Sequence, residues 1–137
     1  MLFTLSGCAI FTNEDPAATA WATAYPEAPD RIGTLDIQVF RENTRISMTN
    51  TTPRTLPAGR IWLNRRFSHP VDELPAGESL DLSLLGFVDE FGEVFRAGGF
   101  FATIQPDPVV LVEWGSEADG DAAPELIGLV IVSNEMS

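Results

Sequence analysis

The chain has 137 residues, of which 45% are hydrophobic and 20% charged, a composition typical of one globular domain with its own core. Its formal net charge of −12 and its pI near 4.2 disfavour binding to nucleic acid, whose phosphates require lysine and arginine. They also disfavour electrostatic adsorption to an anionic bilayer. A single cysteine cannot form an internal disulfide, so the core or a metal has to stabilise the fold.

The charge is unevenly distributed along the chain. Residues 1–70 hold seven arginines and six acidic residues, whereas residues 71–137 hold one arginine and fourteen acidic residues. One interpretation is a docking surface for a basic partner or a cation. The other, which we favour, is that arginines of the first half form ion pairs with acids of the second half.

The N-terminal segment contains Leu5-Ser6-Gly7-Cys8. This tetrapeptide resembles the lipobox of bacterial lipoproteins, in which a branched apolar residue and two small residues precede a cysteine. The resemblance implies that signal peptidase II cuts before Cys8, that the thiol is linked to diacylglycerol and that the new N-terminus is acylated. It therefore predicts a lipid-anchored protein of the cell envelope, facing the periplasm or the outside.

The segment before Cys8 departs from the lipoprotein pattern. Only seven residues precede the cysteine and none is basic, whereas an export signal has a positive start and about 7–15 apolar residues. We favour the interpretation that residues 1–7 are the remnant of a signal peptide whose start lies further upstream. The alternative is an apolar N-terminal strand with a buried free thiol, in a cytosolic β protein whose lipobox arose by chance.

Residues 8–33 are expected to be the lipidated N-terminus and a linker, with three prolines at 16, 26 and 29. A flexible tether of this length spans roughly 25–30 Å. Within it, the segment 17–25 carries Trp21 and Tyr25, which are too apolar for a free linker. We expect this segment to form a short helix or a strap that docks on the domain.

Residues 34–137 are expected to form the folded domain, because alternating and continuous apolar runs replace helical periodicity there. The runs near 109 and 126 are apolar on both faces, as in fully covered strands, and Gly128 suggests a bulge. About seven strands at this spacing are typical of a β-sandwich. They are expected at 34–40, 45–50, 60–64, 79–85, 98–104, 109–112 and 126–132.

Two turn signals accompany these strands. The first two strands are separated by Arg41-Glu42-Asn43-Thr44, which favours a hairpin. The tetrapeptide Leu56-Pro57-Ala58-Gly59 recurs as Leu74-Pro75-Ala76-Gly77, and each copy precedes a strand. Proline at the second and glycine at the fourth position fit a type I turn.

The turn-to-strand step LPAGESLDL and the apolar strand ends are similar to those of immunoglobulin-like sandwiches in extracytoplasmic bacterial lipoproteins. The resemblance implies an all-β, single immunoglobulin-like β-sandwich after an N-terminal tether. The Cys…Trp…Cys pattern of antibody domains is absent, and jelly-roll and C2-like topologies remain alternatives.

No catalytic residues are predicted, and the protein is not expected to be an enzyme. His69 is the only histidine, and a relay with Ser68 or Ser79 and Asp72 lacks a nucleophile-elbow motif. One histidine and one cysteine are too few for a zinc site. Asp119 and Asp121 are weak calcium candidates, as are the carboxylates at 89, 90 and 93, but the EF-hand pattern is missing. No cofactor is expected.

The remaining candidates concern binding. Arg60 and Arg65 belong to the one basic cluster, and Trp62 and Trp114 are aromatics that could stack on a sugar. These residues are the predicted partner-binding set, for an unknown envelope protein or a glycan. The sequence thus predicts a bilayer-anchored domain with a non-catalytic binding or structural role, and a calcium-dependent or glycan-binding module as the alternative.

Overall fold

The computed structural model of this protein describes residues 18–98, 105–116 and 124–132. These ranges contain seven strands and two 3₁₀ helices, which confirms the all-β class. No helix in them is long and apolar enough to cross a membrane. The elements are η2 (Ala18–Trp21), β1 (Asp30–Glu42), β2 (Arg45–Thr49), β3 (Gly59–Leu63), β4 (Phe67–Val71), β5 (Ser79–Ser83), η3 (Leu84–Gly86), β6 (Val112–Ser116) and β7 (Glu125–Val132).

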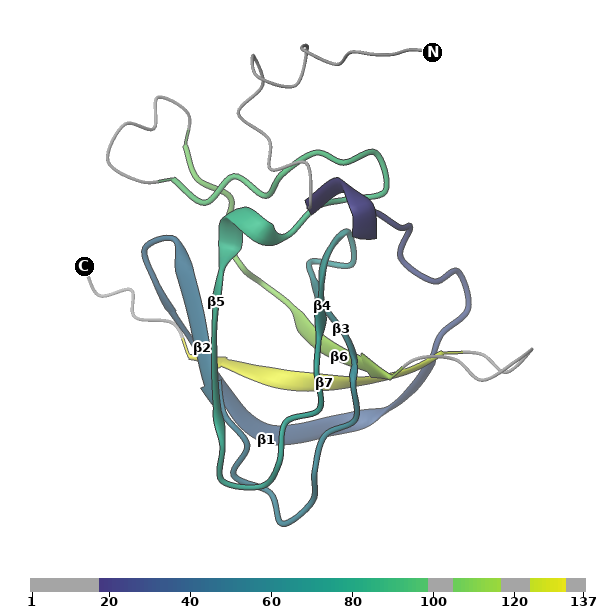
Figure 1. Cartoon of the computed structure of the whole chain (residues 1–137), viewed down its shortest axis with the longest axis vertical. Helices are drawn as coiled ribbons and strands as arrows, with labels where there is room; N and C mark the ends of the chain where they lie inside the picture. Colours follow the sequence, from purple (N-terminus) through teal and green to yellow (C-terminus); the bar gives the residue numbers. More distant parts are fainter. Residues whose placement is uncertain (1–17, 99–104, 117–123, 133–137) are drawn as a thin grey trace, which may run out of the picture.

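All seven strands belong to one mixed sheet in the order β4-β3-β6-β7-β1-β2-β5. The pair β1–β7 is parallel, and the other neighbours are antiparallel. The sheet curls so that β2 and β5 face β3 and β4 across the interior, while β1 and β7 form the floor between them (Figure 1). This single curled sheet is the sandwich-like body that the sequence predicts. Its kinship with immunoglobulin domains stays a prediction.

Strand β1 makes the curl possible because it is long and irregular. It starts at Asp30, before the predicted start at Thr34, and its register against β7 shifts twice, on either side of Thr34. Gly33 has φ +126°, a value that only glycine adopts readily. The bulge predicted from Gly128 is present, but the extra residues lie in β1 opposite that glycine.

The predicted hairpin between the first two strands is confirmed. Glu42 pairs with Arg45, so Asn43 and Thr44 form the two-residue loop. Asn43 has φ +55°, the left-handed conformation that tight hairpin turns require and that asparagine tolerates.

Two strand predictions need correction. Residues 67–71 form β4, although Pro70 indicates a loop; proline is tolerated because β4 is an edge strand. In the apolar run 109–112 only Val112 belongs to a strand. The preceding residues follow two prolines, and the side chain of Asn64 accepts hydrogen bonds from the amides of Val110 and Leu111. The predicted strand 98–104 lies almost wholly outside the described residues.

The two LPAG copies contact each other. Leu56 and Leu74 exchange a pair of backbone hydrogen bonds of 2.9 Å, and a strand follows each copy, as predicted. The type I prediction is wrong for the second copy. There the turn runs from Pro75 to Glu78 and has Gly77 in its third position with φ +84°, as a type II turn requires. In the first copy, Gly59 is already the first residue of β3.

The hydrophobic core fills the inside of the curl. The alternating apolar residues of the first two strands point inward, since Ile37, Val39, Ile46 and Met48 are buried. Leu84 of η3 and the segment after it close the upper end of the curl (Figure 1). Further buried members of this core are Ile61, Leu63, Phe67, Phe87, Phe95, Val112, Trp114 and Leu129.

Candidate functional site

The segment from Trp21 to Pro26, here called the strap, docks on the outer face of the sheet. The indole nitrogen of Trp21 donates to the carbonyl of Gly86 (3.1 Å), and Arg60 Nη1 donates to the carbonyl of Trp21 (2.7 Å). The ring of Tyr25 meets the ring of Trp62 edge-on at 5.3 Å. The sequence predicts a short helix or a docked strap here, and the structure combines the two: the 3₁₀ helix η2 leads into a strap that docks on the domain.

A buried carboxylate binds the strap at Tyr25, in addition to the contacts of Trp21. Glu113 of β6 is 4% exposed, and its Oε1 accepts a hydrogen bond of 2.7 Å from the hydroxyl of Tyr25. Arg31 donates to the tyrosine oxygen (2.8 Å) and to the other carboxylate oxygen (3.4 Å). Burial raises the pKa of Tyr25, and so does its hydrogen bond to Glu113. Both oxygens of the carboxylate are therefore occupied by structural partners.

The predicted partner-binding residues are dispersed by the fold. Trp62 and Trp114 are 4% and 1% exposed, and they lie on opposite faces of the sheet. Neither indole is exposed enough to serve as the stacking surface for a sugar that the sequence suggests. Arg60 contacts the strap and also donates to the Ser68 hydroxyl (3.0 Å), and its guanidinium lies 6.0 Å from the Trp62 ring centre. Arg65 is exposed in the β3–β4 turn, with φ +59°.

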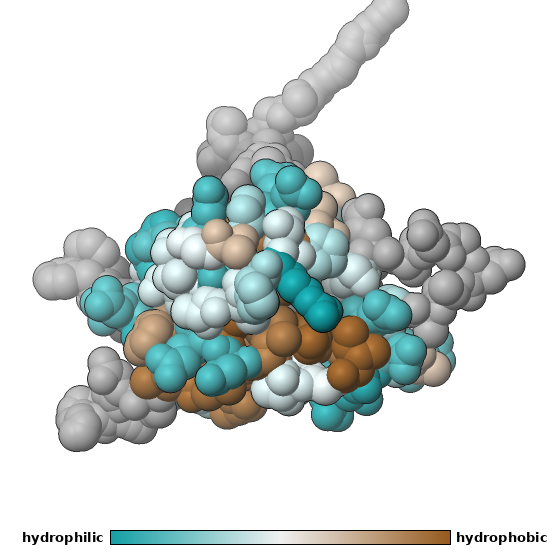
Figure 2. All heavy atoms as spheres, turned by 90° about the horizontal axis from the view of Figure 1, so that it is seen from below, coloured by the Kyte–Doolittle hydropathy of each residue, from teal (hydrophilic) through white to brown (hydrophobic). Residues whose placement is uncertain are grey.

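The fold instead creates an apolar groove at its lower end, which the sequence did not reveal. The groove has a volume of about 530 Å³ and leads to Trp114, whose indole nitrogen donates to the carbonyl of Pro57 (2.8 Å). Seen from below, apolar side chains form a band across this end of the molecule (Figure 2). Residues that line the groove include Ile32, Leu35, Leu56, Pro57, Trp114 and Ile127.

The wall of the groove is held by a buried asparagine. Asn50 donates to the carbonyls of Arg54 (2.7 Å) and Leu74 (2.9 Å). Its side-chain oxygen accepts from the amide and the hydroxyl of Thr52. The loop 50–57 is therefore fixed in place by hydrogen bonds, and the groove is preformed.

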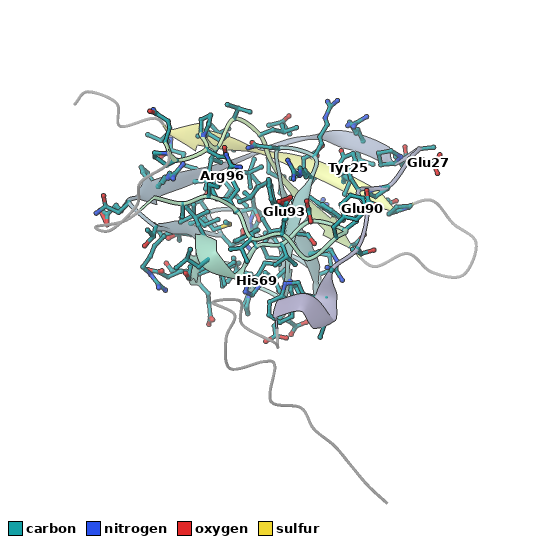
Figure 3. All side chains as sticks on the ribbon, turned by 90° about the horizontal axis from the view of Figure 1, so that it is seen from above. Tyr25, Glu27, His69, Glu90, Glu93 and Arg96 are labelled. Atoms are coloured by element: carbon teal, nitrogen blue, oxygen red, sulfur yellow. The ribbon has the colours of Figure 1, made fainter. Side chains whose placement is uncertain are left out.

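His69 lies near the strap and not in a catalytic relay (Figure 3). Its Nδ1 donates to the carbonyl of Pro70 (2.6 Å), and its ring packs between those of Trp21 and Phe87 at 5.1 and 5.3 Å. Ser68 is buried and bonded to Arg60. Among the described hydrogen bonds, none joins His69 to Ser68, Ser79 or Asp72.

The acidic segment near residue 89 is an ion-pair network. Asp89 is 2% exposed and accepts from Nε and Nη2 of Arg66 (3.1 and 2.8 Å), which also contacts Glu93 (3.1 Å). Burial raises the pKa of Asp89, but the hydrogen bonds from Arg66 and from two backbone amides outweigh it and leave the pKa below its usual range. The described residues contain no cluster suited to a metal ion. Asp119 and Asp121 lie outside them.

Ion pairs within the domain account for part of the uneven charge distribution. Arg31 pairs with Glu113, Arg45 with Asp81, and Arg66 with Asp89 and Glu93. Every one of these pairs joins an arginine of the first half to an acid of the second half, which confirms the favoured interpretation.

Comparison with known proteins adds nothing further, since no family model, curated protein or solved structure matches the chain.

Proposed function

We propose that this protein is a non-catalytic binding domain of the cell envelope, attached to a bilayer through acylated Cys8. The observation that carries the proposal is the separation of its two ends. Helix η2, where the strap begins, lies at the upper end of the domain, and the chain then runs down its side to β1 (Figure 1). The apolar residues that line the groove belong to the opposite, lower end, where Figure 2 shows an apolar band. A lipid-tethered chain therefore presents the groove away from its attachment side.

The anchor itself rests on the sequence. Cys8 is the only cysteine, and Leu5-Ser6-Gly7 precede it in lipobox order. One acyl chain gives only marginal, reversible attachment, whereas two or three chains give stable attachment. Diacylglycerol on the sulfur together with an acylated amino group therefore suffices to keep the domain on the membrane without a spanning helix.

The docked strap shortens the tether. Thirteen peptide units separate Cys8 from Trp21, the first residue with a described contact to the body of the domain. Fully extended, they span at most about 45 Å. The domain is therefore held close to the membrane, nearer than a linker that continued freely to residue 33 would hold it.

The groove supports binding of an apolar segment of a partner protein. It is preformed, it is lined chiefly by apolar side chains, and Ile32 at its rim is 53% exposed. Recognition sites for apolar ligands have this character. Glycan binding is less well supported, because sugar recognition needs an exposed aromatic face and the indoles of Trp62 and Trp114 are buried.

The experiment expresses the protein from its native gene context, with Cys8→Ser as the control. The wild-type protein should partition with membranes, and its intact mass should show loss of residues 1–7 and gain of acyl chains. The Cys8→Ser variant should stay unacylated and soluble. A native product with a free thiol and residues 1–7 still attached would refute the anchor.

The groove is tested separately with the soluble Cys8→Ser form and the neutral apolar dye Nile red. Dye fluorescence should rise on binding, and Ile32→Asp should abolish most of the rise. Phe40→Asp is the matched control, since Phe40 is 43% exposed and does not line this groove. Equal loss in both variants, or no binding by the wild type, would contradict the proposed site.

A further inference from the structure

Three large apolar side chains project from the upper end of the domain. Phe91 is 82% exposed, Val110 69% and Leu85 52%. Leu85 lies in η3, beside Gly86, which accepts the hydrogen bond from Trp21. Val110 is bonded through its amide to Asn64 in the β3–β4 turn, and Phe91 lines a hollow with Tyr25 and Arg65. Leu85 and Phe91 therefore belong to the segments that close the upper end of the domain, beside η2 and the start of the strap (Figure 1), and Val110 lies next to the β3–β4 turn.

Phe91 is displayed on a rigid turn. The buried carboxylate of Asp89 accepts hydrogen bonds of 2.9 Å from the amides of Phe91 and Glu93, and the backbone of Asp89 bonds to both Gly92 and Glu93. Arg66 fixes the same carboxylate from outside the turn. These hydrogen bonds keep Phe91 exposed in one conformation. Because the turn is already ordered, little further conformational entropy is lost when Phe91 binds to another surface.

The charges around this tip are mixed. Arg65 and Arg66 flank it on one side, and Glu90 and Glu93 lie next to it in the turn (Figure 3). Such a surface neither attracts nor repels a zwitterionic headgroup layer strongly. The net charge of −12, in contrast, opposes approach to an anionic layer.

We infer that the upper end of the domain rests on the bilayer that holds Cys8, with Phe91, Leu85 and Val110 entering the headgroup region. The inference rests on the proposed lipid attachment. The length of the chain before the domain supports contact between this end and the bilayer. Only thirteen peptide units separate the lipidated Cys8 from Trp21, which lies at the same end.

The tether is needed for this contact. Three partly inserted side chains bind a membrane weakly by themselves, since attachment strength scales with buried apolar area. Tethering converts the second contact into an intramolecular event at a high effective concentration. The domain then lies on the surface in one orientation, with the groove facing away from the lipid.

The test supplies the tether chemically, so that it does not depend on natural acylation. Because Cys8 is the only cysteine, the full chain can be coupled there to a maleimide lipid in phosphatidylcholine vesicles. The control is the same chain capped with a soluble maleimide. Hydroxyl-radical footprinting then reports the oxidation rate of each apolar side chain. On vesicles, the rates of Phe91, Leu85 and Val110 should fall several-fold, while those of Phe40 and Ile32 should stay unchanged.

Variants make the result specific. Phe91→Ser should remove most of the vesicle-dependent protection of Leu85 and Val110, whereas Phe40→Ser should leave it intact. Equal oxidation of Phe91 on vesicles and in the capped control would overturn the inference, as would protection centred on Ile32. If the native product carries no lipid but the coupled chain shows this protection, the proposed anchor fails and the membrane-facing surface stands.

Discussion

Tyr25 is the only tyrosine of the chain, so its ionisation can be followed in the absorbance of the whole protein. Burial and the hydrogen bond to Glu113 raise its pKa above the ordinary value of 10.0. Because this pKa is higher in the folded state than in the unfolded state, the stabilisation that Tyr25 contributes is fully present below about pH 10. It is lost as the pH rises through the pKa of Tyr25 in the folded state. We expect an alkaline titration midpoint above that of the denatured chain. Glu113→Gln should bring the midpoint back down, and an unchanged midpoint would contradict the described contact.

Asp89 provides a second prediction at the residue scale. Asp89→Asn should reduce the free energy of unfolding by about 2 kcal/mol at neutral pH, because it weakens hydrogen bonds between a buried carboxylate and a guanidinium. Because the pKa of Asp89 is lowered in the folded state, its carboxylate stabilises the fold fully above about pH 4. This stabilisation is lost as the pH falls through the pKa of Asp89 in the folded state. Denaturant unfolding at pH 7 and at acidic pH measures the difference, which should shrink in acid. Glu90→Gln, on an exposed neighbour, should change little.

At the scale of elements, the two LPAG copies give glycine two different roles. A Cβ on Gly59 would lie 1.9 Å from the carbonyl oxygen of Gly115, which belongs to the paired strand β6. Gly59→Ala should therefore destabilise the protein by about 3 kcal/mol or more, because backbone has to move. Gly77 has open space around it but φ +84°, so Gly77→Ala should cost only about 1–2 kcal/mol. Urea unfolding of both variants checks the order, and a reversed order would refute this assignment.

Local patterns in the sequence predicted the elements whose side chains alternate and whose turns are short. The hairpin through Asn43, the existence of β1 and β2 and the docking of Trp21 and Tyr25 all follow from local residue types. The edge strand β4 could not be predicted in this way, because its proline is tolerated only at a position that the whole sheet determines. The apolar groove was missed for the same reason. Its walls come from segments that are distant in the sequence. The local sequence around Trp114 also does not indicate whether this side chain is buried or exposed.

For the whole molecule, net charge and ion pairs act in opposite directions. The charge of −12 destabilises the compact state by self-repulsion, whereas ion pairs with half-exposed arginines stabilise it only slightly. Screening shortens the Debye length from roughly 30 Å at 0.01 M salt to about 8 Å at 0.15 M. We therefore expect the free energy of unfolding to rise with sodium chloride over this range, measured by urea titration. A decrease would show that the ion pairs dominate.

The position of β7 has a consequence for how the sheet closes. The last described strand lies between β6 and β1, and without it the sheet divides into a β4-β3-β6 piece and a β1-β2-β5 piece. Neither half has a closed interior, so the two pieces join only when β7 pairs with both β6 and β1. Closure of this sheet therefore depends on a single strand that pairs with both pieces and follows the other six strands in the sequence.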